Sequence, residues 1–187
     1  MDKRWILHKR PDNEQVKRFS SELNINTKLG SLLFSRSVNN FEDAKMFFRP
    51  KLEHLHDPFL MKDMDKAVDR VMLAIAKSEK IMVYGDYDVD GTTAVSLVYS
   101  FLKIFYKNIE FYIPDRYNEG YGISYKGIDH AKQNNVKLII ALDCGIKAVE
   151  KVDYAKKKGV DIIIGDHHRP GDIIPAASAV LDPKQDD

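Results

Sequence analysis

The sequence predicts an α/β protein in which a doubly wound, mainly parallel sheet follows a helical N-terminal segment. Short apolar runs rich in β-branched residues alternate with helical segments from residue 80 onward. No comparable strand pattern occurs before that point. Continuous apolar runs separated by helices are typical of parallel strands buried on both faces. We therefore expect a helical segment over residues 1–79 and an α/β core over residues 80–187.

The N-terminal helices are predicted by apolar residues at helical spacing. Val16, Phe19 and Leu23 form one such group, and Phe41, Ala44 and Phe48 form another. Breaks at Arg49–Pro50 and Asp57–Pro58 precede a clear helical stripe over residues 63–76.

The core elements follow in regular alternation. Strands are expected at 81–84, 109–113, 138–142 and 162–164, with a further short strand at 179–181. Helices are expected at 92–106, 124–134 and 148–158. Right-handed crossovers between parallel strands give a doubly wound sheet, which binds ligands at the carboxyl ends of its strands.

Composition excludes several classes of protein. The net charge is +1, with 44% hydrophobic and 30% charged residues, an ordinary globular balance. The single cysteine, Cys144, excludes an internal disulfide framework and is expected to be a small buried residue. No apolar stretch is long enough for a membrane span, and we expect a cytoplasmic protein without membrane contact.

The first strand runs into an acidic, glycine-flanked segment, Gly85–Asp86–Tyr87–Asp88–Val89–Asp90–Gly91. Carboxylates packed at contact distance repel one another by about 4 kcal/mol per pair at an effective dielectric near 20, and a divalent cation removes that cost. Thr92 and Thr93 are expected to open a helix whose N-terminus favours anions. The alternatives are a solvated acidic turn or a calcium loop, but an EF-hand would need glutamate where Leu97 stands.

Two later strands also end in candidate ligands. Asp143 closes the third strand, where it could instead cap the next helix. Asp166, His167 and His168 follow the fourth strand. Carboxylates with imidazole and no suitable cysteine favour Mn²⁺, or Mg²⁺, over structural zinc. So many acidic groups suit two ions that activate water and hold a phosphoryl group, with His168 as a ligand or a phosphate contact.

These motifs resemble the DHH phosphoesterase superfamily, named for the triplet at residues 166–168. Within it, the segments 85–91 and 112–122 are similar to the RecJ family of single-strand-specific 5′-to-3′ DNA exonucleases. Trp5 and Asp57–Pro58 are also similar to that family, so the resemblance covers essentially the whole chain.

The resemblance implies a role for each matching residue. Asp88, Asp90, Asp143 and His167 would bind metal, with Asp86 a further member of the acidic cluster. Asp166 and His168 would be catalytic, His168 lying beside the attacked phosphate. Arg116 would contact substrate phosphate together with Asn118, Thr92 and Thr93, although Arg116 could instead pair with Asp115 or Glu119. Tyr117 and Tyr121 could stack on bases or simply pack. Tyr84 stands where some members of the superfamily carry a metal-binding histidine.

The implied activity is metal-dependent hydrolysis of single-stranded DNA in repair and recombination, with two ions in the complete enzyme and other replication or repair proteins as further partners. Family members continue beyond residues 181–183 to another metal-binding aspartate and a second domain, so this chain is expected to be a fragment with weak or absent nuclease activity. The alternatives are a DHH phosphoesterase acting on short oligonucleotides or small nucleotides, and a non-catalytic DNA-binding scaffold. A dinucleotide-binding Rossmann protein would carry a glycine-rich turn instead of the three carboxylates after the first strand.

Overall fold

The structure, a computed structural model, describes residues 4–6 and 11–185 and divides into two compact units, residues 1–56 and 57–187. The first unit contains α1 (Asn13–Glu22), α2 (Thr27–Phe34), α3 (Phe41–Phe48) and the short 3₁₀ helix η1 (Leu52–His54). Its small core consists of Phe19, Leu33, Val38 and Ala44. Asp12, Asn26 and Asn40 cap the three α-helices through their side chains, which explains where these helices begin.

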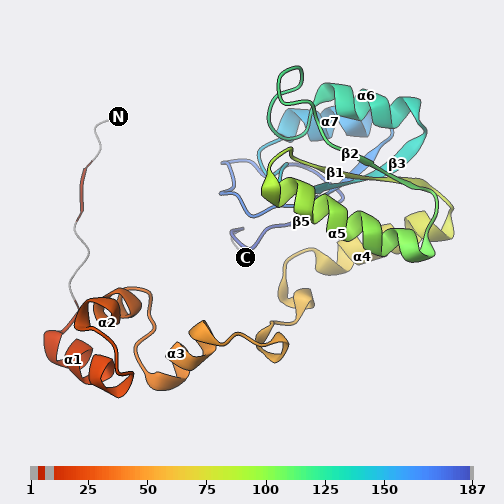
Figure 1. Cartoon of the computed structure of the whole chain (residues 1–187). Coiled ribbons are helices and arrows are strands. Elements are labelled where there is room, and N and C mark those ends of the chain that lie inside the picture. The colour runs from red at the N-terminus through yellow and green to blue at the C-terminus, as the bar shows by residue number, and fades with distance from the viewer. Residues whose placement is uncertain (1–3, 7–10, 186–187) are drawn as a thin grey trace. The chain divides into compact units, whose positions relative to one another are not determined.

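The second unit is the α/β core (Figure 1). It begins with the 3₁₀ helix η2 (Pro58–Leu60) and α4 (Met64–Ala76). The elements that follow are β1 (Lys80–Gly85), α5 (Val89–Phe105), β2 (Ile109–Tyr112), α6 (Tyr125–Gln133), β3 (Val136–Leu142), α7 (Val149–Lys157), β4 (Asp161–Gly165) and β5 (Ala179–Leu181). Each strand expected in the α/β core is present, and the predicted fold class is confirmed.

The sheet has the strand order β2-β1-β3-β4-β5, and every pairing is parallel. The chain therefore leaves β1 toward one edge of the sheet and returns past it to β3. The carboxyl ends of β1 and β3 form the switch point, which is where open sheets of this order bind ligands.

Helices cover both faces of the sheet, as a doubly wound fold requires (Figure 1). On one face, Ile81, Val83, Leu138 and Ile140 pack against α4 and α5. On the other, Met82, Tyr84, Ile139 and Ile162 pack against α6 and α7. Alternate residues of one strand thus enter different cores, which explains why the strand sequences are apolar throughout.

Helix α4 packs with the sheet, although it lies within the 1–79 segment of the expected division. Its contacts with β3 and β5 place it in the second compact unit. Arg70 strengthens this attachment, because its guanidinium lies 2.7 Å from carboxylate oxygens of both Glu79 and Asp161. The boundary between residues 79 and 80 stays a prediction, whereas packing divides the chain after His56.

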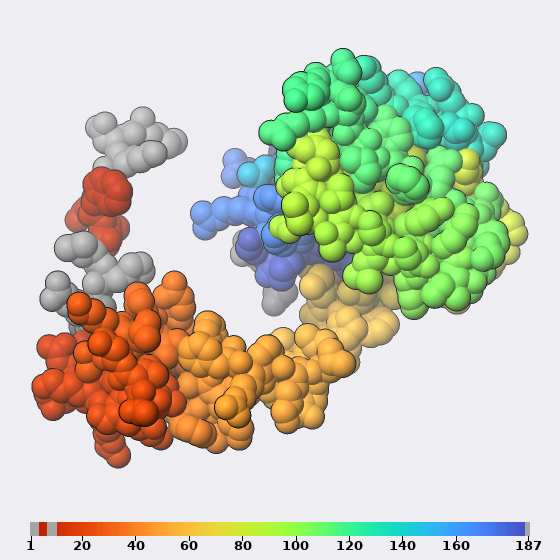
Figure 2. All heavy atoms as spheres, viewed as in Figure 1, coloured from red at the N-terminus to blue at the C-terminus, as the bar shows by residue number. Residues whose placement is uncertain are grey.

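Helix α5 begins at Val89, three residues before the expected start at Thr92. The reason is its N-cap, because the Asp88 carboxylate accepts a hydrogen bond from the Gly91 amide and so starts the helix inside the acidic segment. Figure 2 shows α5 at the surface, in yellow-green. Its outward stripe of Leu97, Phe101, Ile104 and Phe105 is exposed. No described helix is long and apolar enough to cross a membrane.

Candidate metal centre

The three carboxylates after β1 occupy different environments. Asp88 caps α5, with Oδ1 3.0 Å from the Gly91 amide nitrogen. Asp90 lies in the first turn of α5 and is exposed. Asp86 is fully buried, and its Oδ1 accepts a hydrogen bond of 3.1 Å from the Gly122 amide. One acidic segment therefore presents two carboxylates outward and one inward.

Gly91 makes this close arrangement possible. A Cβ atom at this position would lie 2.4 Å from the carbonyl oxygen of Asp86 and 2.6 Å from its amide nitrogen. Both contacts involve backbone atoms, which cannot move aside as a flexible side chain can. Glycine is therefore required for α5 to begin directly against the end of β1.

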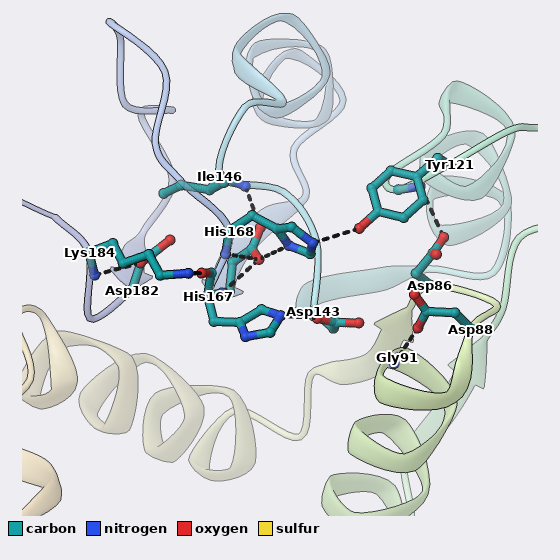
Figure 3. A network of polar contacts seen from close by, with 12 residues as sticks. Asp86, Asp88, Gly91, Tyr121, Asp143, Ile146, His167, His168, Asp182 and Lys184 are labelled. Atoms are coloured by element: carbon teal, nitrogen blue, oxygen red, sulfur yellow. Dashed lines mark hydrogen bonds and ion pairs between the residues drawn. The ribbon is translucent and has the colours of Figure 1, made fainter. Parts of the chain in front are cut away.

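Asp143 and His167 meet at the ends of β3 and β4 (Figure 3). Asp143 Oδ1 lies 3.1 Å from His167 Nε2, and one ligand atom from each of Asp143, His167 and His168 falls within 4.8 Å of the others. Asp143 does not cap the following helix, because Ala148 holds the N-cap position of α7. A pocket of about 510 Å³ is lined by Asp143 and His167 together with Asp90. The switch point thus brings ligands from β1, β3 and β4 together.

The charges at this point favour a bound cation. Burial raises the pKa of Asp143, and the negative charge of Asp88 raises it further. Asp86 adds a buried carboxylate oxygen, Oδ2, with no hydrogen-bond partner among the described residues. A divalent cation would relieve this repulsion, and oxygen and imidazole donors suit Mn²⁺ or Mg²⁺. The residues present therefore fit the metal that the sequence predicts.

Asp166 organises the histidine pair (Figure 3). Its side chain is only 1% exposed. It accepts hydrogen bonds from the Ile146 amide at 3.0 Å, the His167 amide at 2.7 Å and the His168 amide at 3.1 Å. Burial opposes ionisation, but these donors outweigh it and hold the pKa of Asp166 below its ordinary value. Asp166 is therefore a fixed anion beneath the two histidines.

His168 is held from both ends of its ring. Nδ1 lies 2.7 Å from Asp166 Oδ1, and Nε2 lies 3.2 Å from the Tyr121 hydroxyl (Figure 3). Because an ionised carboxylate can only accept, the Nδ1–H group of His168 donates a hydrogen bond to Asp166. Burial, together with the surrounding aspartates, raises the pKa of Tyr121 to about 12, so this tyrosine stays a neutral hydroxyl. The result is an oriented imidazole beside Asp143.

Arg116 lies on the loop of residues 114–124, which we call the Arg116 loop. The guanidinium carbon of Arg116 lies 5.1 Å from the centre of the ring of Tyr87, a residue of the acidic segment. Among the described residues it forms no ion pair with Asp115 or Glu119, the alternative that the sequence left open. Tyr87 in turn makes an edge contact with Tyr121, whose hydroxyl contacts His168. A chain of side chains thus connects Arg116 with the histidines.

Glu119 holds the Arg116 loop together. Its carboxylate accepts hydrogen bonds from the Asp115 amide at 2.8 Å, the Ser124 hydroxyl at 2.5 Å and the Tyr112 hydroxyl at 3.0 Å. Burial opposes ionisation, but these hydrogen bonds prevail and lower the pKa of Glu119. Asn118 donates its backbone and side-chain N–H groups to Asp115, so here it supports the loop.

The two threonines of α5 lie inside the helix and not at its start. The Thr92 amide and hydroxyl both donate to the Asp88 carbonyl, so neither donor is directed outward. Thr93 is exposed in the next position. Their contact with substrate phosphate, like those of Arg116 and Asn118, stays a prediction.

Several residues that shape the site were missed or read differently from the sequence. Lys184 follows β5, and its ammonium group donates a hydrogen bond to the His167 carbonyl oxygen. The buried Tyr84 faces the α6 side of the sheet, and its hydroxyl bonds the Gly122 carbonyl at 2.9 Å and the Ser124 amide at 3.1 Å. Tyr84 therefore holds the C-terminal end of the Arg116 loop against the sheet. No local pattern indicates these roles, because each partner lies far away in the chain. Cys144 is buried as expected.

Comparison with known proteins places this site in a family. The model of the DHH family, N-terminal domain, matches residues 80–187. This chain belongs to the DHH family. The match contains each of the strand ends described above, including the Asp166–His167–His168 triplet that marks the family.

Individual relatives agree with this assignment. The chain is 42% identical over 182 residues to the single-stranded-DNA-specific exonuclease RecJ of Bacillus subtilis, a match that covers 97% of this chain and 23% of the relative. A crystal structure of exonuclease RecJ bound to manganese matches at 28% identity with a TM-score of 0.63, over 69% of this chain and 33% of that one. The Mn²⁺ complex of RecJ from Thermus thermophilus, at 22% identity and a TM-score of 0.67, covers 93% of this chain and 24% of that chain, and shows the same fold. The chain thus spans about a quarter of the length of the RecJ proteins it matches.

Proposed function

We propose that this chain carries the metal-binding centre of an exonuclease that hydrolyses single-stranded DNA in the 5′-to-3′ direction during repair and recombination. The observation that carries the proposal is the meeting of Asp143, His167 and His168 at the switch point, beside the acidic segment after β1. The names of the similar proteins, single-stranded-DNA-specific exonucleases and a manganese-bound RecJ, support it.

In this proposal Asp88, Asp90, Asp143 and His167 hold the divalent ions, Mn²⁺ or Mg²⁺, two in the complete enzyme, and Asp86 completes the acidic cluster. When bound, the ions supply a nucleophilic water at neutral pH and stabilise charge on the reacting phosphate. Asp143 and His167 follow β3 and β4, and Asp88 and Asp90 lie at the start of α5 after β1, so pairing of these three strands brings the four ligands to one edge of the sheet.

His168 and Arg116 act on the phosphate. Asp166 keeps a proton on His168 Nδ1 and directs the ring's Nε2 toward the site, where the Tyr121 hydroxyl now lies. We propose that, with DNA bound, both ring nitrogens of His168 carry protons, so that the Nε2–H donates a hydrogen bond to a phosphate oxygen in place of that contact. Arg116, held on the Tyr87 ring, offers a planar guanidinium that can bind phosphate through two donors. Single-stranded DNA is thus the proposed substrate, and other replication or repair proteins are proposed partners.

A cytoplasmic location belongs to the same proposal. DNA repair requires access to DNA, and a single buried cysteine needs no oxidising compartment.

Manganese titration of this chain by isothermal titration calorimetry tests the metal centre. Asp143→Asn keeps the shape of the side chain but removes the negative charge of the carboxylate that contacts His167. Mn²⁺ binding should therefore be lost or greatly weakened. Asp153→Asn, on the exposed side of α7, is the matched control and should bind like the unchanged chain. Equal Mn²⁺ binding by Asp143→Asn and the unchanged chain would contradict the proposed centre.

Substrate class is tested by Mn²⁺-dependent digestion with this chain and with a longer polypeptide that contains it. Single-stranded DNA, duplex DNA and a dinucleotide should be compared at equal phosphate concentration. Preference for the long single strand supports the exonuclease. Preference for the dinucleotide would instead indicate a small-substrate phosphoesterase, and Mn²⁺ binding without digestion by either polypeptide would indicate a scaffold.

A further inference from the structure

A second pocket with basic lining lies beside the metal centre. It has a volume of about 410 Å³, and its charged lining residues are Lys62, Arg169, Lys184 and Asp172. Three basic residues and one acidic residue therefore line one small concave space. This contrasts with the metal-centre pocket, which is lined by Asp90, Asp143 and Asp166.

The two pockets are neighbours because the same three chain segments line both. Met61, His167 and Pro183 line the metal-centre pocket, whereas Lys62, Arg169 and Lys184 line the basic pocket. Two of these pairs are adjacent residues and the third is two residues apart. Consecutive Cα atoms lie about 3.8 Å apart. A polymer that enters one pocket can therefore reach the other within a short length.

Arg169 and Lys184 have hydrogen-bond donors to offer in this pocket. Arg169 is exposed and makes no hydrogen bond or ion pair with any residue that the structure describes. Lys184 donates one N–H to the His167 carbonyl oxygen, which leaves two of the three donors of its ammonium (Figure 3). The backbone amide of Lys184 donates a hydrogen bond to Asp182 Oδ1 at 2.8 Å, and this turn fixes the position of the Lys184 backbone.

We propose that the basic pocket binds a backbone phosphate of the single strand, next to the phosphodiester held at the metal centre. This inference rests on the proposed function. It extends that function by assigning the path along which the DNA strand leaves the metal centre. A phosphodiester carries one negative charge and accepts hydrogen bonds in the plane that a guanidinium offers. Attraction by Arg169 and Lys184 also offsets the repulsion that the nearby carboxylates exert on DNA.

The test is the salt dependence of DNA binding, because each phosphate contact to a single strand contributes about 0.7 to the slope of log affinity against log salt. A fluorescein-labelled thymidine oligonucleotide with phosphorothioate linkages, which resist cleavage, is titrated with this chain in the presence of Mn²⁺. Fluorescence anisotropy gives the affinity at several salt concentrations. Arg169→Gln should weaken binding up to about fivefold, the range of an exposed ion pair, and lower the slope by about 0.7.

Controls separate this role from others. Lys132→Gln removes the same charge from an exposed position on α6 and should leave affinity and slope nearly unchanged. Lys184→Gln should act like Arg169→Gln. Mn²⁺ binding by Arg169→Gln should equal that of the unchanged chain, since this residue contacts no proposed ligand side chain.

Three results would overturn the inference. The first is an Arg169→Gln slope equal to that of the unchanged chain, and the second is the absence of DNA binding by the unchanged chain at low salt. The third is a loss limited to oligonucleotides with a 5′-terminal phosphate, which would assign the pocket to the end of the strand and not to its backbone. Failure of the unchanged chain to bind Mn²⁺ in calorimetry, by contrast, would refute the proposed function. The salt dependence of DNA binding would still decide whether the basic pocket contacts phosphate.

Discussion

Glu119 offers the sharpest test of how the Arg116 loop is held. Its carboxylate is the common acceptor for the Asp115 amide, the Ser124 hydroxyl and the Tyr112 hydroxyl. Glu119→Gln keeps the shape of the side chain but removes its charge and replaces one acceptor oxygen with a donor. We expect the loop to lose stability without loss of the fold.

The size of the effect follows from those three hydrogen bonds. Hydrogen bonds to a charged group are roughly twice as strong as neutral ones, a difference of about 0.5–1 kcal/mol for each bond. Three such bonds give an expected loss of about 1.5–3 kcal/mol in the free energy of unfolding.

The loss should also depend on pH. Hydrogen bonding keeps the pKa of Glu119 in the folded protein below its unfolded value of about 4.3. Its charge therefore stabilises the fold fully above that unfolded value, and the contribution disappears as pH falls through the lower folded pKa. The difference between Glu119→Gln and the unchanged chain should accordingly be largest at neutral pH and shrink in acid.

Urea unfolding followed by near-ultraviolet circular dichroism measures this difference. All nine tyrosines lie between Tyr84 and Tyr154, within the α/β unit, whereas the single tryptophan, Trp5, lies in the other unit. The tyrosine signal therefore reports the α/β unit alone. Asp153→Asn is the control and should change stability by less than about 0.5 kcal/mol.

A Glu119→Gln loss no larger than that of the control would refute the reasoning. So would a loss of the expected size that stays constant from neutral pH down to pH values below the pKa of the carboxylate, because it would show that the charge is not its origin.

Three further results are expected. Gly91→Ala places a Cβ atom 2.4 Å from the Asp86 carbonyl oxygen, so it should destabilise the α/β unit by about 3 kcal/mol and abolish Mn²⁺ binding in calorimetry; normal binding would contradict this. Arg70→Met leaves two carboxylates without their partner and should cost about 2 kcal/mol in urea unfolding, and a neutral effect would show that the pairing is dispensable. Burial raises the pKa of Cys144, so iodoacetamide should not alkylate it in the folded protein but should do so in urea, as mass spectrometry can measure; rapid alkylation of the folded protein would show that the thiol is accessible.

The switch point illustrates how far local sequence reaches. Apolar runs and helical spacing are properties of neighbouring residues, and they predicted the strands and helices of the α/β core. They also predicted that Asp90, Asp143 and His167 follow strand ends. The strand order, which puts β1 beside β3, depends on pairing between residues far apart in the chain, and local periodicity does not contain it.

The start of α5 shows a finer limit. The pair Thr92 and Thr93 resembles a helix start, yet Asp88 caps the helix because Gly91 lets the backbone approach the end of β1. Competition between two possible caps is settled by packing against the strand, which exists only in the folded chain.

The sequence by itself determined the class of fold, the strands that carry the candidate ligands and the kind of metal those ligands suit. Only the tertiary structure decided which side chains contact the candidate ligands and position them. Tyr121 bonds His168, Lys184 bonds the His167 carbonyl oxygen, and Arg169 faces a pocket shared with Lys62. These partners are separated by many residues, or meet only because separate loops converge at one edge of the sheet. The physical reason is that hydrogen bonds and charges act through space, whereas sequence patterns report only neighbours along the chain.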